Sequence, residues 1–227
     1  MTNSATEAND ERRLRQSLII AGGFVAVLWL IQLDAAVFDL NLSHLGIYPH
    51  RISGLLGIAF APLIHGSFLH LLANSLPIVV IGTALLYGYP RSAGLVLTCL
   101  YAGTGLGVWL FAREAYHIGA SGLTFGMMFF VFTIGALRWD RRAIALSSLV
   151  FFLYGGMIWG IFPGDPEVSY ESHFFGALLG VILAIVCRNR DPAPPERRYS
   201  WETEEATQSE VPDDAPGRDG SGPTTLH

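Results

Sequence analysis

Six long apolar segments constrain this chain more than any other feature. They occupy residues 18–33, 69–87, 93–112, 121–137, 143–162 and 173–187, and none of them contains Asp, Glu, Lys or Arg. An α-helix needs about 20 predominantly apolar residues to cross the hydrocarbon core of a bilayer. The whole chain is 51% hydrophobic and only 15% charged, which is more apolar and less charged than an ordinary soluble domain. We therefore predict an all-α membrane protein with six transmembrane helices.

The remaining stretches divide the chain into three parts. Residues 1–16 form a polar N-terminal segment, residues 17–190 hold the six-helix core, and residues 191–227 are rich in Pro, Glu, Asp, Ser and Gly. The last composition is typical of a disordered tail. Within the core, the apolar run at 55–64 is interrupted by Pro62 and is too short to span a bilayer. We expect this run to dip into the membrane or to lie at its surface.

The placement of arginine indicates the orientation in the membrane. All 14 basic residues are arginine, and with a cytoplasmic N-terminus nine of those near the span ends lie inside, against Arg51 and Arg113 outside. Both termini are therefore expected in the cytoplasm. Short loops and the lack of an organelle targeting signal favour a bacterial inner (plasma) membrane. The net charge of −5 reflects acidic residues concentrated after Arg190, and no basic patch indicates nucleic acid.

Polar residues gather at the outer ends of three spans. Because alternate spans run in the same direction, Ser121 in the fourth span and His173 in the sixth lie at one depth. The second span also starts at this level, and its residues His70 and Asn74 are four positions apart, so they share a helix face. Ionisable residues inside a membrane are costly to bury and therefore indicate function. The topology predicts a functional site near the outer face.

The stretch Gly119-Ala120-Ser121-Gly122 suits a nucleophile. A helix start directs free N–H groups and the positive end of the helix dipole at an anion, and small residues let a substrate come close. Nucleophilic attack on a carbonyl creates such an anion. The same small residues also fit simple close packing of membrane helices, so the motif alone leaves both interpretations open.

Two G-x-x-x-G pairs predict a close crossing of the fourth and sixth spans. Gly122 and Gly126 form one pair, and Gly176 and Gly180 form the other, just after His173. Small residues let two membrane helices approach closely. Such a crossing brings a serine oxygen within about 3 Å of a histidine nitrogen. The alternative is that these glycines serve packing stability alone.

Three motifs together resemble a known family. They are His65-x-x-x-x-His70-x-x-x-Asn74, Gly119-Ala120-Ser121-Gly122 and His173-x-x-Gly176-x-x-x-Gly180. In this order and on these spans they resemble the rhomboid intramembrane serine proteases, over about residues 18–190. The resemblance implies a six-transmembrane-helix, rhomboid-like bundle whose active site opens outward. Many members carry a Trp-Arg pair in the first outer loop and a glutamate near the end of the second span; this chain has neither, which leaves the subfamily open.

The resemblance also implies an activity and its residues. Ser121 matches the nucleophile and His173 its general base, a dyad without a carboxylate. His70 and Asn74, with the backbone N–H of Ser121, match the groups that hold the oxyanion. The implied activity is that of a serine endopeptidase, which needs no cofactor. It would cut single-span membrane proteins in or near their transmembrane segment, within the lipid bilayer.

Three further assignments follow from the same resemblance. His65 matches a histidine that braces the first outer loop. Phe125 matches an aromatic residue that packs against the catalytic histidine. Residues 163–171 correspond to a flexible cap, and the fifth span to a side gate for the substrate.

Other polar residues near the outer face have simpler interpretations. Glu171 lies two positions before His173, so it faces another side of the helix and is expected to be a solvated helix start. We expect His117, like the other loop histidines, to be solvated or interfacial. His65 and His70, with His173, also invite a metal site, although their five-residue spacing differs from the i, i+4 spacing of a helical zinc pair.

Two other function classes remain open at this stage. One is a non-catalytic membrane-helix-binding protein of the rhomboid superfamily. Absence of Ser121 or His173 would have indicated this class, but both residues are present. The other is a transporter. That class is disfavoured because the polar residues lie at one face rather than at the membrane midplane, and because no inverted repeat is visible.

Overall fold

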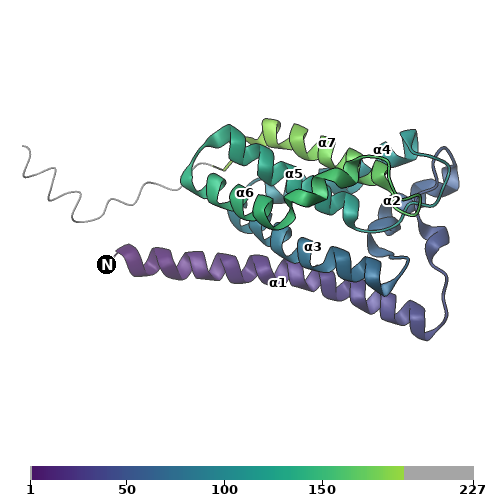
Figure 1. Cartoon of the computed structure of the whole chain (residues 1–227). Helices are drawn as coiled ribbons and strands as arrows, with labels where there is room; N and C mark the ends of the chain where they lie inside the picture. The colour runs from purple at the N-terminus through teal and green to yellow at the C-terminus, as the bar shows by residue number, and fades with distance from the viewer. Residues whose placement is uncertain (1, 192–227) are drawn as a thin grey trace, which may run out of the picture. The chain divides into compact units, whose positions relative to one another are not determined.

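Helices make up the fold (Figure 1). The computed structural model describes residues 2–191, so the predicted tail at 191–227 lies outside the described residues except for Asp191. The long helices are α1 (Thr2–Val37), α3 (Phe68–Gly88), α4 (Ala93–Phe111), α5 (Ser121–Arg138), α6 (Arg141–Tyr154) and α7 (Tyr170–Cys187). A short helix α2 (Gly57–Phe60) and four 3-10 segments, Ser43–Leu45, Ile52–Leu56, Ala61–Leu63 and Gly155–Ile161, complete the regular elements of this part of the chain.

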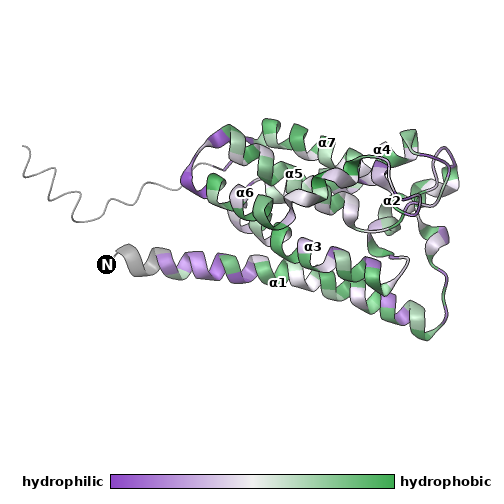
Figure 2. Cartoon of the chain, viewed as in Figure 1, coloured by the Kyte–Doolittle hydropathy of each residue, from purple (hydrophilic) through white to green (hydrophobic). Residues whose placement is uncertain are grey.

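Six helical segments are long and apolar enough to cross a membrane, as predicted. They are Glu7–Val37, Phe68–Gly88, Ala93–Phe111, Ser121–Arg138, Arg141–Ile161 and Tyr170–Cys187. Figure 2 shows the apolar residues along these helices and the polar residues at the start of α1 and at the α5–α6 connection. The chain is therefore an all-α, integral multi-pass membrane protein.

Two helix boundaries differ from the sequence-based expectation. The first helix begins at Thr2 rather than at residue 18, so the polar N-terminal segment is the start of α1. Ala, Glu and Arg in this segment are good helix formers, which explains why the helix continues past the apolar residues. The fifth span changes from α-helix to 3-10 helix at Gly155, where two glycines follow each other. Adjacent glycines weaken an α-helix because they lose the most backbone freedom on folding.

Helix α5 is the centre of the bundle and packs against α3, α4, α6 and α7. Its residues Met128, Phe130 and Ile134 are fully buried in the main core. The predicted crossing with α7 is confirmed: side chains added at Gly176 and Gly180 would collide with backbone carbonyls of α5. Only glycine leaves room for two helix backbones this close.

The first outer loop, residues 38–67, forms short helical turns instead of a span. Its apolar residues Ile52 and Leu56 are largely exposed, while Ile47 and Ala61 pack against α4. The loop ends at Ser67, whose side chain accepts a hydrogen bond from the backbone N–H of His70 and caps α3. This cap fixes where α3 begins and so places His70 in its first turn.

Candidate active site

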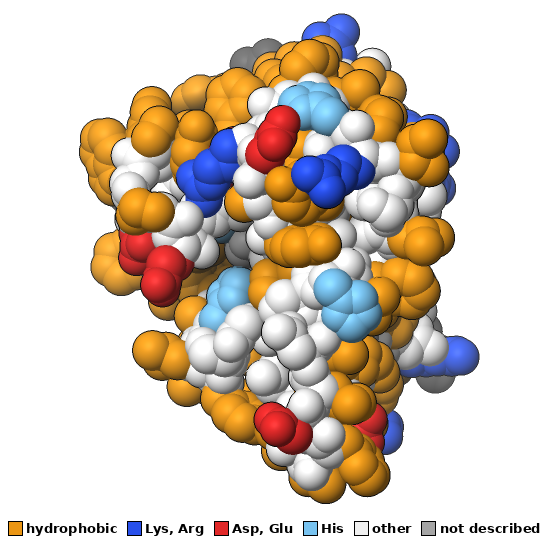
Figure 3. All heavy atoms as spheres, turned by 90° about the vertical axis from the view of Figure 1, so that its right-hand side faces the viewer, with side chains coloured by type: hydrophobic (Ala, Val, Ile, Leu, Met, Phe, Trp, Pro, Cys, Tyr) orange, Lys and Arg blue, Asp and Glu red, His pale blue; other side chains and the backbone are white. Residues whose placement is uncertain are grey.

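The starts of α5 and α7 place a serine beside a histidine. Ser121 Oγ lies 2.8 Å from His173 Nε2, within hydrogen-bonding distance. His173 is only 8% exposed, whereas Ser121 is half-buried. The two residues are 52 positions apart, and the glycine crossing of α5 and α7 brings their helices together. Figure 3 shows the end of the molecule at the right of Figure 1, where histidine side chains reach a largely uncharged central surface flanked by hydrophobic side chains.

Two contacts orient the His173 ring. Its Nδ1 lies 2.8 Å from the backbone oxygen of Gly160, and its face stacks on Phe125 with ring centroids 4.0 Å apart and planes 2° from parallel. A carbonyl oxygen only accepts hydrogen bonds, so Nδ1 carries the proton and Nε2 of the neutral ring is the acceptor. The ring is thus set to accept the Ser121 hydroxyl proton. Sequence analysis missed Gly160, because a backbone carbonyl leaves no residue-type signal.

A strained turn precedes the serine. Gly119 has φ +109°, a backbone conformation that side chains disfavour, and its N–H donates to the carbonyl of Ala61 at 2.8 Å. A side chain at this position would also come within 2.9 Å of the His70 ring. Glycine at 119 therefore permits both the turn and the close approach of His70.

His70 and Asn74 both lie on α3, where the His70 ring approaches the serine turn and the Asn74 side chain binds the backbone of His70. The His70 ring is against Gly119, next to the Ser121 helix start. Asn74 is buried, and its Nδ2 donates to the backbone oxygen of His70 at 2.9 Å. An amide nitrogen has two hydrogens, so this bond leaves one N–H of Asn74 for another acceptor.

His65 is buried beneath the serine turn. Its Nε2 lies 3.4 Å from the backbone nitrogen of Ala120, and its ring is 5.0 Å from the His70 ring. Burial, with the neighbouring His70, lowers the pKa of His65 to about 4, so the ring is neutral at physiological pH. Within residues 2–191, no group of three His, Cys, Asp or Glu residues is arranged to hold a metal ion.

The expectation that Glu171 is solvated is wrong. Glu171 is buried, and its Oε1 lies 3.7 Å from Nε of Arg113. Arg113 also donates to the backbone oxygens of Pro166 and Val168, at 2.8 and 2.9 Å. The loop after α4 therefore supplies a partner that neutralises the buried carboxylate, which the position of Glu171 on its own helix does not indicate.

Of the two expectations for His117, solvated or interfacial, the first is wrong because the residue is buried. This ring is only 2% exposed, and its Nδ1 lies 2.7 Å from Ser169 Oγ while Nε2 lies 3.0 Å from the backbone oxygen of Arg113. Burial lowers the pKa of His117, with a smaller opposing effect of its hydrogen bond to Arg113. Together with Arg113, His117 anchors the loop at 162–169 to the loop before α5.

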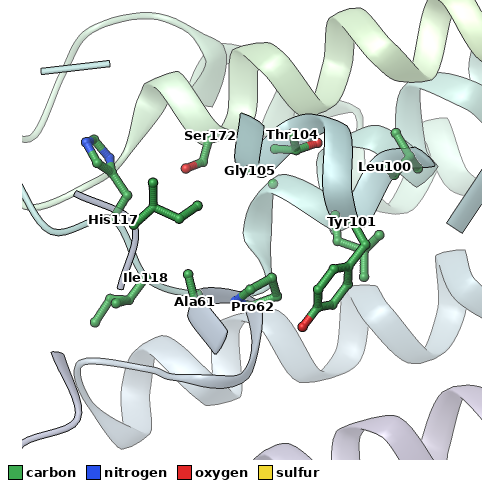
Figure 4. A pocket seen from close by; sticks show the side chains of 13 residues that line it. Ala61, Pro62, Leu100, Tyr101, Thr104, Gly105, His117, Ile118 and Ser172 are labelled. Carbon is green, nitrogen blue, oxygen red and sulfur yellow. The ribbon is translucent and has the colours of Figure 1, made fainter. Parts of the chain in front are cut away.

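A small cavity lies behind the serine turn (Figure 4). Its lining includes Gly119 and Gly122 as well as Thr104 and Ser172, of which Figure 4 labels the last two. The Oγ1 atom of Thr104 is buried and has no hydrogen-bond partner among the described residues. The cavity volume is about 20 Å³, roughly the space that one water molecule needs.

The fold and the site define a class: a multi-pass helical membrane protein with a serine–histidine contact near one membrane face. Comparison with known proteins then shows the family. Residues 53–190 match the Rhomboid domain, and the chain belongs to the rhomboid family.

The chain is also similar to individual proteins, of which the plant relative carries the family's name. The chain is 35% identical to the uncharacterised protein Rv1337 of Mycobacterium tuberculosis over 185 residues, covering 77% of this chain and 75% of the relative. It is 31% identical to the uncharacterised protein ML1171 of Mycobacterium leprae, over 89% of this chain and 83% of the relative. RHOMBOID-like protein 2 of Arabidopsis thaliana is 28% identical, over 64% of this chain and 44% of the relative. No solved structure matches the chain significantly.

Proposed function

We propose that this protein is an intramembrane serine endopeptidase with Ser121 as nucleophile and His173 as general base. The observation that carries the proposal is the 2.8 Å contact between Ser121 Oγ and His173 Nε2, on a ring whose Nδ1 faces the Gly160 carbonyl. A serine hydroxyl needs an adjacent base to become an effective nucleophile, and this tautomer supplies one.

The chemical steps follow from this geometry. Ser121 Oγ attacks a peptide carbonyl while its proton passes to His173 Nε2. The tetrahedral intermediate expels the amine, which takes the proton from His173, and an acyl-enzyme remains. A water molecule, deprotonated by His173, then attacks the ester; the acid product leaves and the Ser121 hydroxyl is restored.

The oxyanion of each tetrahedral intermediate would be held at the start of α5. The backbone N–H of Ser121 is one of the N–H groups in the first turn of α5, which have no acceptor within the helix. The His70 ring beside Gly119 and the second N–H of Asn74 are the proposed side-chain donors. The proposed substrates are single-span membrane proteins, which reach the site from the lipid bilayer. The proposed location is a bacterial inner membrane, with both termini in the cytoplasm.

Cleavage and labelling of the purified protein together test this proposal. We expect wild type to cleave single-span membrane substrates and to react at Ser121 with a fluorophosphonate probe, which needs an activated serine but no substrate. Folded Ser121→Ala and His173→Ala should do neither. Folded wild type that binds membrane helices without cleavage or labelling would support the non-catalytic alternative. Cleavage by Ser121→Ala at the wild-type rate would overturn the mechanism.

A further inference from the structure

Two arginines meet at one backbone carbonyl at the end of the bundle opposite Ser121. Arg13 of α1 and Arg142 of α6 both donate to the oxygen of Tyr87, at 3.1 and 2.6 Å. Both guanidinium groups also lie over the Tyr87 ring, with Cζ 5.8 and 4.6 Å from its centroid. Since they share one acceptor, the two positive charges are held close to each other.

Capping of α3 explains only part of this arrangement. Tyr87 is in the last turn of α3, where carbonyls have no partner within the helix, and one arginine is enough to satisfy such a group. A second guanidinium adds repulsion between like charges. Arg142 also keeps a buried Nε with no acceptor among the described residues.

The neighbouring carboxylates do not neutralise this pair. Asp140 binds Arg138 at 2.8 Å and caps the N–H of Ala143, while Asp191 accepts from the backbone of Arg91 and from Ser92. Arg138 pairs with Asp140 and Arg113 with Glu171, and neither arginine at Tyr87 takes part in these ion pairs. Among the described residues, the pair therefore has unmet capacity for an anion.

The position of the pair indicates which anion. Arg13 lies one to two turns before residue 18, where the apolar part of α1 begins, and Arg142 lies at the start of the span Arg141–Ile161. Both side chains are half-buried at the level where an apolar helix reaches the polar headgroups. Basic sites between helices at this level suit the phosphate of anionic lipids.

We propose that Arg13, Arg142 and Tyr87 form a binding site for the phosphate of an anionic phospholipid. The bound headgroup offsets the repulsion between the two guanidinium groups and links α1 to α3 and α6. This link matters because α1 packs mainly against α3 and buries little of its surface. The inference is independent of the proposed protease activity.

The test is thermal unfolding of the full chain in neutral detergent, with added dioctanoyl phosphatidylglycerol, dioctanoyl phosphatidylcholine or sodium phosphate. We expect phosphatidylglycerol to raise the melting temperature by several degrees and the other two additions to raise it much less. The increase should be at least halved in Arg13→Gln and in Arg142→Gln. It should persist in Arg12→Gln and Arg141→Gln, which remove the same charge from exposed neighbouring positions.

Three results would overturn the proposal. Equal melting-temperature shifts in all four variants would indicate general attraction to a basic surface. A shift with phosphatidylcholine as large as that with phosphatidylglycerol would exclude recognition of the net charge of the lipid. A shift of the same size with sodium phosphate would indicate a site for free anions. If Arg142→Gln does not fold, native mass spectrometry of wild type and Arg13→Gln decides. Wild type should retain one phosphatidylglycerol at collision energies that remove it from Arg13→Gln, and equal retention would refute the site.

Discussion

The carbonyl oxygen of Gly160 lies 2.8 Å from Nδ1 of His173, where a carboxylate stands in a serine protease triad. This oxygen belongs to the 3-10 segment Gly155–Ile161, so the orientation of the proposed base depends on the backbone between α6 and α7. Glu171, two positions before His173 in the sequence, is turned toward Arg113 instead.

Replacement of Gly160 by alanine should disturb the proposed base. The added Cβ would lie 2.8 Å from Phe125 Cζ and 3.3 Å from His173 Nδ1, so the Phe125 ring must shift, and the histidine ring stacked on it is displaced with it. Misplacement of a catalytic group by about 1 Å costs on the order of 10²-fold in rate, and we expect such a loss in kcat. Gly156→Ala is the matched control, because a Cβ there meets nothing within 4 Å. Equal kcat in both variants would contradict the role of the Gly160 carbonyl.

The variant Glu171→Gln tests whether the catalytic group is a dyad of Ser121 and His173 or a triad that includes Glu171. Because Glu171 pairs with Arg113 at the start of α7, we expect kcat to stay near the wild-type value. A carboxylate that orients the catalytic histidine would instead cost on the order of 10⁴ in kcat. Steady-state kinetics on one membrane substrate decide between these outcomes, and a loss of the larger size would make Glu171 part of the site.

Asn74→Ala tests the proposed oxyanion donor. Removal of one such donor lowers kcat on the order of 10² to 10³, with little change in KM, because the interaction forms mainly in the transition state. The variant also loses the hydrogen bond to the His70 carbonyl, so its folding must be checked by thermal unfolding. Near-normal turnover in a folded Asn74→Ala would remove Asn74 from the site.

Gly176→Ala should destabilise the bundle. A Cβ at this position collides with the Gly122 carbonyl across the α5–α7 crossing, and overpacking of this kind typically costs about 1–3 kcal/mol. Gly94→Ala is the control on α4, where an added Cβ meets nothing within 4 Å. We expect chemical denaturation in detergent to show lower stability for Gly176→Ala only. Equal stability of the two variants would show that the crossing tolerates a methyl group.

Because the His65 ring is buried in its neutral form, we expect the protein to lose stability in acid. Its pKa is about 4 in the folded protein, against 6.5 for a free histidine, so between these values the unfolded chain binds the proton more strongly. Above about pH 6.5, where His65 is neutral in both states, its titration does not lower the free energy of unfolding. As the pH falls toward 4, the free energy of unfolding decreases by up to about 3 kcal/mol, because only the unfolded chain binds the proton. His65→Gln does not titrate. Its unfolding free energy should therefore fall less between pH 7 and 4, and slopes identical to wild type would contradict the assignment.

Much of the fold and part of the candidate site could be predicted from the sequence. Uncharged apolar segments identify the six spans because backbone groups in lipid must be hydrogen-bonded within a helix. The alternating direction of the spans then brought Ser121, His173 and His70 to one level, and the G-x-x-x-G pairs indicated which helices cross. These inferences use local composition and periodicity, which the sequence displays directly.

Only the tertiary structure revealed the contacts that loops and backbone atoms make across long separations. The burial of Glu171 depends on Arg113, which is 58 positions away, and the orientation of His173 depends on a carbonyl in the segment before α7. Likewise, the meeting of Arg13 and Arg142 at Tyr87 depends on how α1 and the start of α6 pack against the end of α3. The sequence by itself determined which segments enter the membrane, because hydropathy is a property of each segment. The partners of its polar groups were decided by the folded path of the chain, because burial and hydrogen bonding depend on what lies nearby in space.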